Sequence, residues 1–262
     1  MNGKKYRILL TNDDGIYAPG LSALYQALKS DHELYVVAPE SEMSAVGHAI
    51  TLTSPLRVQE IHMGKSFFGY AVTGTPADCI KIAVQELLES PPDIILSGIN
   101  LGANVGIDVL YSGTVSAATE GAYLGISSAA ISLDTRQNPD FGFAARFSKE
   151  IIRFMKKSGL KKEIALNINI PAVPPTKIKG VCFARQGTSR LKERFERRTD
   201  PRGNVYYWLT GEMVIEKNGR TDSDSIALSE NKITITPLTC NLTSLDDLKR
   251  MNSHNFSFRC DI

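Results

Sequence analysis

The chain has 262 residues, a length that suits one large domain with an appendage or two modest domains. Hydrophobic residues make up 42% of it and charged residues 22%, which is ordinary for a soluble globular protein. The formal net charge of +2 gives no general reason to expect binding to nucleic acid or to a membrane surface, and no apolar run reaches the length of a membrane span.

The cysteines indicate a reducing compartment. Cys79, Cys182, Cys240 and Cys260 have no C-x-x-C spacing, so neither a disulfide framework nor a zinc knuckle is predicted. The apolar run near the N-terminus is too short for the core of a signal peptide. We therefore expect a cytoplasmic protein.

The first part of the chain alternates strand-like and helix-like segments. Apolar runs predict strands at 6–11, 33–38, 93–97, 128–133 and 164–170, with further extended pieces at 50–53, 56–63 and 67–72. Helices are predicted at 19–29, after the N-cap Thr75, at 114–124 and at 140–158. Continuous apolar strands separated by helices predict an α/β fold with a mainly parallel sheet covered on both faces.

The character of the chain changes after Pro171. Strands are predicted at 178–184, 205–215 and 232–238, a short final helix at 242–251, and a basic, polar segment at 185–198. The aromatic residues at 206–208 have little local core to join, so we expect a hairpin that reaches onto another subunit. We divide the chain into a core at 1–184 and a C-terminal extension at 185–262 of arm, hairpin, return strand and helix.

Two adjacent carboxylates follow the first predicted strand. Asp13 and Asp14 would repel each other there unless a cation or hydrogen-bond donors offset their charge. Ligands bind at the carboxyl ends of strands in open α/β sheets. The segment Asn-Asp-Asp-Gly is also good turn chemistry, but its position and doubled charge favour a divalent cation.

The loop after the second strand adds two candidates. Ser44 and His48 are able to face the first strand, because consecutive parallel strands usually neighbour each other. Ser44 taken alone is equally suited to a surface loop. His48 has two interpretations, a general acid or phosphate contact on the one hand and a structural histidine on the other, and the second is favoured.

The strand at 93–97 runs into a glycine-rich loop, and a further helix start follows. Asn100 offers a neutral oxygen ligand at the end of the strand, although the glycine pattern matches neither a Walker loop nor G-x-G-x-x-G. Ser112 to Ser116 open a helix, where backbone N–H groups and hydroxyls make an anion site or simply an N-cap. Two carboxylates, a hydroxyl and an amide form an all-oxygen set that suits Mg²⁺, Mn²⁺ or Ca²⁺. A cation beside an anion-binding helix start predicts phosphate-ester chemistry.

Together these segments closely resemble the SurE family of survival-protein 5′/3′-nucleotidases. The resemblance covers nearly the whole chain and is carried by the segments at 11–15, 38–48, 74–79, 97–104, 111–115, 166–171 and 235–238. It implies a Rossmann-like three-layer sandwich whose C-terminal hairpin and helix are exchanged between subunits of a homodimer or homotetramer.

The resemblance also implies a divalent-metal-dependent phosphatase acting on nucleoside 5′-monophosphates, with 3′-monophosphates and short polyphosphate as further candidates. It implies one Mg²⁺ or Mn²⁺ per subunit on Asp13, Asp14, Ser44 and Asn100. Asp13, Asp14 and Asn100 are the predicted catalytic residues. The predicted phosphate- and substrate-binding residues are Ser44, His48, Asn104, Ser112, Gly113, Thr114 and Ser116.

Several alternatives remain at this point. One aspartate would activate the attacking water or attack phosphorus itself, and the first is favoured. The basic residues at 185–194 would contact an anionic substrate or form a solvated arm, and the arm is favoured. The chain lacks the lysine that a receiver domain needs after a later strand, since Asp134 has no lysine beside it. It also lacks the Asp-x-Asp motif of a haloacid-dehalogenase-type phosphatase. A non-catalytic nucleotide-binding module is the remaining alternative.

Overall fold

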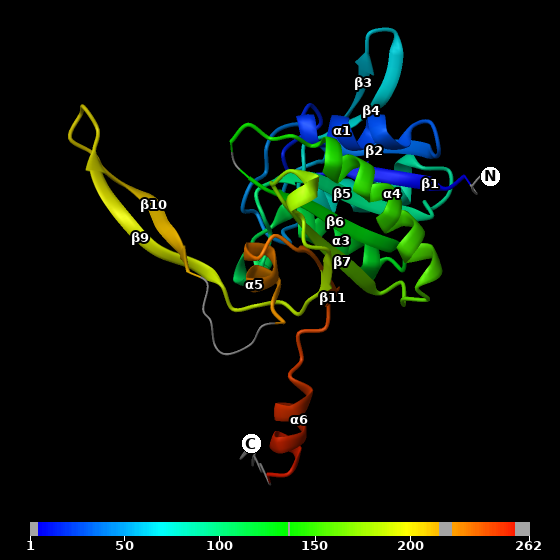
Figure 1. Ribbon diagram of the computed structural model, residues 1–262. Helices are drawn as coiled ribbons and strands as arrows, with labels where there is room; N and C mark the ends of the chain where they lie inside the picture. The colour runs from blue at the N-terminus through cyan, green and yellow to red at the C-terminus, as the bar shows by residue number, and fades with distance from the viewer. Residues whose placement is uncertain (1–4, 136, 215–221, 255–262) are drawn as a thin grey trace, which may run out of the picture.

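The computed structural model describes residues 5–135, 137–214 and 222–254. Within them, a nine-stranded sheet in the order β3-β4-β2-β1-β5-β6-β7-β11-β8 forms the body of the protein (Figure 1). Among these strands, β3–β4 and β11–β7 are antiparallel and the other neighbouring pairs are parallel. The sheet strands are β1 (Arg7–Thr11), β2 (Glu33–Pro39), β3 (Val58–Met63), β4 (Ser66–Val72), β5 (Ile94–Leu101), β6 (Ser127–Asp134), β7 (Ile164–Pro171), β8 (Val181–Phe183) and β11 (Ile233–Thr239). This is the predicted α/β architecture.

Helices cover both faces of the sheet. On one face α1 packs on β5 and against α4, and on the other α2 packs against α3, which lies over β5, β6 and β7. The helices are α1 (Pro19–Leu28), α2 (Pro76–Ile82), α3 (Gly113–Tyr123), α4 (Gly142–Lys157), α5 (Asp224–Ser229) and α6 (Leu245–Asn252). The shorter helical turns are η1 (Ala83–Leu87), η2 (Gly106–Leu110) and η3 (Pro175–Lys177). No helix in the described ranges is both long enough and apolar enough to cross a bilayer.

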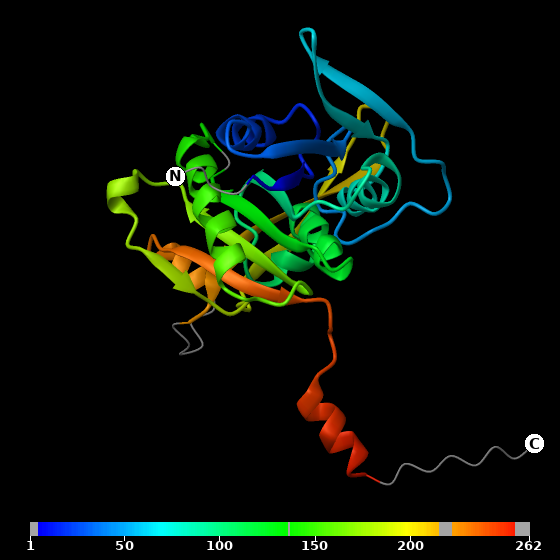
Figure 2. The same cartoon turned by 90° about the vertical axis from the view of Figure 1, so that its right-hand side faces the viewer.

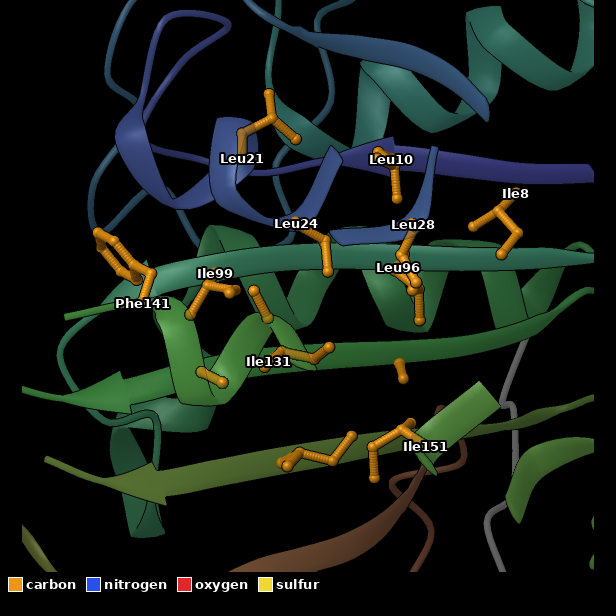
Figure 3. Close-up of a cluster of buried hydrophobic side chains, with 14 of the residues drawn as sticks. Ile8, Leu10, Leu21, Leu24, Leu28, Leu96, Ile99, Ile131, Phe141 and Ile151 are labelled. Atoms are coloured by element: carbon orange, nitrogen blue, oxygen red, sulfur yellow. The ribbon is translucent and has the colours of Figure 1, made fainter. Parts of the chain in front are cut away.

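Alternating side chains of the strands build a core on each face. Ile8 and Leu10 of β1 pack on the α1 side, where Figure 3 shows them near Leu24 and Leu28. Leu9 points to the opposite face and joins a second buried cluster with residues of α2 and α3. This two-sided burial explains why β1 is an uninterrupted apolar run, and it fixes the end of β1 at the centre of the sheet edge.

The C-terminal part contains the predicted hairpin but differs from the prediction in three ways. The predicted basic arm is half strand, because β9 (Arg190–Thr199) pairs with β10 (Val205–Val214) in a separate antiparallel hairpin. Ile215, the predicted end of that second strand, and Cys260 lie outside the described residues. The predicted return strand is β11, which lies inside the main sheet between β7 and β8. The short helix α5 was not predicted. Outside the C-terminal part, the predicted extended piece at 50–53 is a loop.

Two parts of the extension stand away from the body. The β9–β10 hairpin projects to one side in Figure 1, and α6 lies below the body in Figures 1 and 2. Trp208 of the hairpin is 56% exposed, and α6 has no buried residue. Both elements therefore carry apolar surface that the described part of this subunit does not cover.

Candidate active site

The candidate site lies at the carboxyl ends of β1, β2 and β5, which are adjacent strands. The loop after β2 folds back onto the turn after β1 through two backbone hydrogen bonds. Ile16 N–H donates to the carbonyl of Pro39 at 2.8 Å, and Met43 N–H donates to the carbonyl of Asp13 at 2.7 Å. The segment that carries Ser44 is thereby held beside the two aspartates, as the order of the strands predicted.

Asp13 is buried against the start of α3. The hydroxyl of Thr114 donates a short hydrogen bond to its carboxylate. Gly113 leaves room for this contact, since a Cβ at that position would lie 2.7 Å from the Cβ of Asp13. Burial raises the pKa of Asp13, and the hydroxyl of Thr114 and the backbone N–H groups of Thr114 and Gly113 lower it. The helix start therefore faces the first carboxylate directly.

Negatively charged groups near Asp14 disfavour the ionised form of its carboxyl. Burial is the main reason why its pKa is raised from 3.8 to about 6, and the negative charge of Asp13 adds to the effect. Glu42 raises this pKa further, while the backbone of Leu101 lowers it by hydrogen bonding. An uncompensated group of carboxylates at one edge of a sheet is the electrostatic setting in which a bound cation stabilises a protein.

Neutral side chains at the same three strand ends offer further oxygens. A bulge between Gly98 and Asn100 interrupts the pairing of β5 with β6 just before this edge. The amide nitrogen of Asn100 then donates to the carbonyl of Gly102 at 2.8 Å, so its oxygen is the atom left for a ligand. The Ser44 hydroxyl donates to Glu42 at 2.5 Å. Asn12 was not predicted as a site residue, but its buried Oδ1 has no hydrogen-bond partner among the residues that the structure describes.

These donors fit a hard cation. Within the described ranges, no group of three or more His, Cys, Asp or Glu side chains is placed to hold a metal. The predicted ligand set, which combines Asp13 and Asp14 with the neutral oxygens of Ser44 and Asn100, needs no third such side chain. Such a set suits Mg²⁺ or Mn²⁺, which keep several water ligands, better than zinc.

The hydroxyls at the start of α3 are partly engaged within the helix. Ser112 is the N-cap, and its side chain accepts from Val115 N–H at 3.1 Å. Ser116 donates its hydroxyl to the carbonyl of Ser112 at 2.7 Å. Of the predicted phosphate-binding group, Gly113 and Thr114 touch Asp13, whereas Ser112 and Ser116 shape the helix start.

Asn104, a predicted site residue, has its hydrogen-bond partners away from the aspartates. Asn104 donates its amide to the hydroxyl of Ser132 at 2.8 Å, and its backbone joins the side chains of Asn167 and Asn169 on β7. This network anchors the glycine-rich loop to the interior of the sheet. Substrate contact by Asn104 remains a prediction.

His48, in the loop after β2, contacts α3 about two turns from the start of that helix. Its Nε2 is 2.7 Å from the carboxylate of Glu120, which also accepts from Lys81 at 2.9 Å. His48 and Glu120 line a cavity of about 340 Å³ along α3, and Ser116 is the one other predicted site residue in its lining. Glu120 was not predicted, although a glutamate among small residues of a buried helix is a recognisable exception to the apolar pattern.

The family model described as "Survival protein SurE" matches residues 8–193. The 5′-nucleotidase SurE of Syntrophus aciditrophicus is 55% identical over 97% of this chain and 98% of the relative. The 5′-nucleotidase SurE of Syntrophobacter fumaroxidans is 50% identical over 95% of this chain and 99% of the relative.

A solved structure agrees with these relatives. The crystal structure of the SurE protein from Aquifex aeolicus superposes with a TM-score of 0.78 at 38% identity, covering 94% of this chain and all of that one. Sequence and structure thus agree that the chain belongs to the SurE family.

Proposed function

We propose that the protein is a divalent-metal-dependent phosphatase that hydrolyses nucleoside 5′-monophosphates to nucleoside and phosphate. The observation that carries the proposal is the pair Asp13–Asp14, set against the start of α3 with the pKa of both carboxyls raised. Relatives at 50–55% identity over nearly the whole chain are named 5′-nucleotidase SurE, which supports the same activity.

Each residue has a proposed role. Asp13, Asp14, Ser44 and Asn100 would hold one Mg²⁺ or Mn²⁺ per subunit. When bound, such a cation neutralises charge on the phosphoryl oxygens and lowers the pKa of a bound water. The backbone N–H groups and hydroxyls at 112–116 would hold the remaining phosphoryl oxygens.

The Asp13–Asp14 pair supplies the group that activates the nucleophile. We propose that one of the two orients and deprotonates the attacking water, with Thr114 fixing the rotamer of Asp13. Attack by an aspartate oxygen is the alternative, and the stereochemical course at phosphorus distinguishes them. Direct water attack inverts the configuration of a nucleoside thiophosphate made chiral with oxygen isotopes, whereas aspartate attack followed by water retains it.

Nucleotide hydrolysis is tested with a substrate panel. Nucleoside 5′- and 3′-monophosphates and short polyphosphate are incubated with Mg²⁺, Mn²⁺ or EDTA, and released phosphate is measured. Phosphate release from the 5′-monophosphates that requires metal is the expected result. Metal-dependent binding of nucleotide without phosphate release would instead support the non-catalytic nucleotide-binding module.

The oligomeric state and the cellular location of the protein are also proposals. We infer a homodimer or homotetramer assembled through the β9–β10 hairpin and α6, because Phe195, Trp208 and Leu245 expose 66%, 56% and 61% of their surface. Cys79, Cys182 and Cys240 are free, which is compatible with a cytoplasmic location.

A further inference from the structure

A buried carboxylate outside the proposed metal site joins two distant parts of the chain. Asp224, the first residue of α5, has no exposed surface. Its Oδ1 accepts from the backbone N–H groups of Gly187 at 2.9 Å and Ser225 at 2.7 Å, and its Oδ2 accepts from Gly106 N–H at 3.0 Å. A carboxylate is costly to bury unless hydrogen bonds satisfy it, so three backbone donors define a specific role for this side chain.

The partners of Asp224 belong to the root of the hairpin and to the loop after β5. Gly187 lies just before β9, and two further hydrogen bonds join the same segments. Gln186 donates its amide to the carbonyl of Gly106 at 2.7 Å, and Ile107 N–H donates to the carbonyl of Ser189 at 2.9 Å. Gly106 has a φ of +60°, and a Cβ there would lie 2.2 Å from the hydroxyl of Ser189. The two segments are therefore in direct backbone contact.

The segment held by Asp224 leads to the phosphate-binding helix start. Gly106 begins η2, and the carbonyl of Asp108 in that turn accepts from the N–H groups of Tyr111 and Ser112. Ser112 caps α3, whose next residues contact Asp13. One short turn thus separates the bond to Asp224 from the residues that face the aspartates.

We propose that Asp224 is a positioning residue for phosphate binding, acting through Gly106 and η2 on the start of α3. The inference rests on the proposed phosphatase function for its catalytic readout, but not for its structural readout. Asn104 anchors the loop to β6 and β7 from one side, and Asp224 anchors it to the hairpin root from the other. Loss of the second anchor leaves η2 and the helix cap free to shift.

Asp224→Asn is the sharpest substitution. An asparagine oxygen in the place of Oδ1 keeps the donors of Gly187 and Ser225, while the NH₂ group then faces Gly106 N–H as a second donor. The variant removes the hydrogen bond between residue 224 and the loop and retains the bonds within the C-terminal part. Asp222→Asn is the matched control, since Asp222 makes a half-exposed ion pair with Arg185 at 2.8 Å.

Two of the three measured constants, KM and the inhibition constant, do not depend on how much protein is folded, and kcat/KM is expressed per folded enzyme. For Asp224→Asn, the KM for a nucleoside monophosphate and the inhibition constant of inorganic phosphate should each rise severalfold, and kcat/KM should fall on the order of tenfold. Asp222→Asn should match the wild type in all three. Wild-type constants for Asp224→Asn, with activity reduced only in proportion to the folded fraction, would overturn the proposal.

Hydrogen–deuterium exchange gives an independent readout. Peptides covering 102–114 should exchange faster in Asp224→Asn than in the wild type, while peptides from β1 and β7 remain unchanged. If the wild type releases no phosphate from any substrate, the proposed function fails and the exchange data alone judge the anchor. Unchanged exchange at 102–114 would overturn the positioning role in either case.

Discussion

Two helices of this protein, α3 and α6, bury very different shares of their residues. Nine of the 11 residues of α3 are buried, and its first turn contacts Asp13. None of the eight residues of α6 is buried against the described part of the chain, although Leu245, Leu248 and Met251 recur at helical spacing. The first helix is complete within one subunit, whereas the second needs a partner to bury its apolar face.

The strands divide in the same way. β1 has hydrogen-bonded neighbours on both sides and contributes to cores on both faces. In the described structure, β9 and β10 pair only with each other. We therefore expect substitutions at the carboxyl edge of the sheet to change chemistry without changing assembly, and substitutions in the hairpin and α6 to do the reverse.

The largest effect is expected for Asp13→Asn. Removing one ligand charge should cost several kcal/mol of transition-state stabilisation, or about 10³-fold in metal-dependent phosphate release. The fold should persist, because Thr114 can still donate to the asparagine oxygen. Phosphate release and thermal melting check both statements. Asp31→Asn, which removes an exposed carboxylate paired with Lys149, is the control, and full turnover by Asp13→Asn would refute the assignment of the site.

Gly113→Ala should reduce activity on the order of 100-fold, because the new methyl group pushes Asp13 out of place. Helix propensity favours alanine, so the loss should not come from unfolding of α3. Steady-state kinetics and circular dichroism separate the two effects. Gly125→Ala is the control: φ there is +74°, and apart from the adjoining residues no described atom lies within 4 Å of an added Cβ. This variant should cost stability and leave kcat unchanged. Equal kinetics for Gly113→Ala and the wild type would contradict the close contact.

A charge on the apolar face of α6 should change assembly. Leu248→Asp should lower the molar mass in light scattering from that of an oligomer toward 28.7 kDa, the mass of one chain. The thermal midpoint of the core should change little, because Leu248 is not buried within the described subunit. Lys249→Glu serves as the control for added negative charge. An oligomer mass that survives Leu248→Asp would exclude this face from the interface.

The smallest effect concerns pH and Asp14. Its pKa of about 6 in the folded protein exceeds the ordinary 3.8, so between these values the folded state binds more protons than the unfolded chain. The free energy of unfolding of the metal-free protein should therefore fall as pH rises through this window, by about 1 kcal/mol after allowance for solvent screening.

Urea midpoints at pH 4 and pH 7 in EDTA measure this loss. Asp14→Asn should remove most of it, and Mn²⁺ should restore stability to the wild type at pH 7 by offsetting the charge. Identical pH dependence in the wild type and in Asp14→Asn would show that another group is responsible.

That the proposed metal ligands lie at one edge of the sheet was predictable, because strand ends obey a simple rule. The runs that end before Asp13 and Asn100 are buried strands, and parallel strands bring their carboxyl ends to one edge. The N-cap role of Ser112 was likewise predictable from the sequence. These predictions depend on short segments whose own residues determine their structure.

The remaining features depend on partners far away in the chain. His48 is oriented by Glu120 and Asn104 by the asparagines of β7, and no local pattern at either residue identifies those partners. Strand β9 alternates basic and acidic residues with few apolar ones, so its pairing with β10 was hidden by its polarity. Helix α5 was missed because the polar run around Asp224 is typical of a loop, and its role is visible only once Gly106 lies beside it.

The asparagines of β7 limit how this enzyme can be engineered. Asn167 and Asn169 have no exposed surface, and both donate to the carbonyl of Asn104. A thermostabilising library that replaces these asparagines with larger aliphatic side chains would remove both hydrogen-bond donors to that carbonyl. The loop beside the proposed catalytic residues would then be held less firmly. Such libraries should keep both amides fixed and place their diversity on the α1 and α4 side of the sheet.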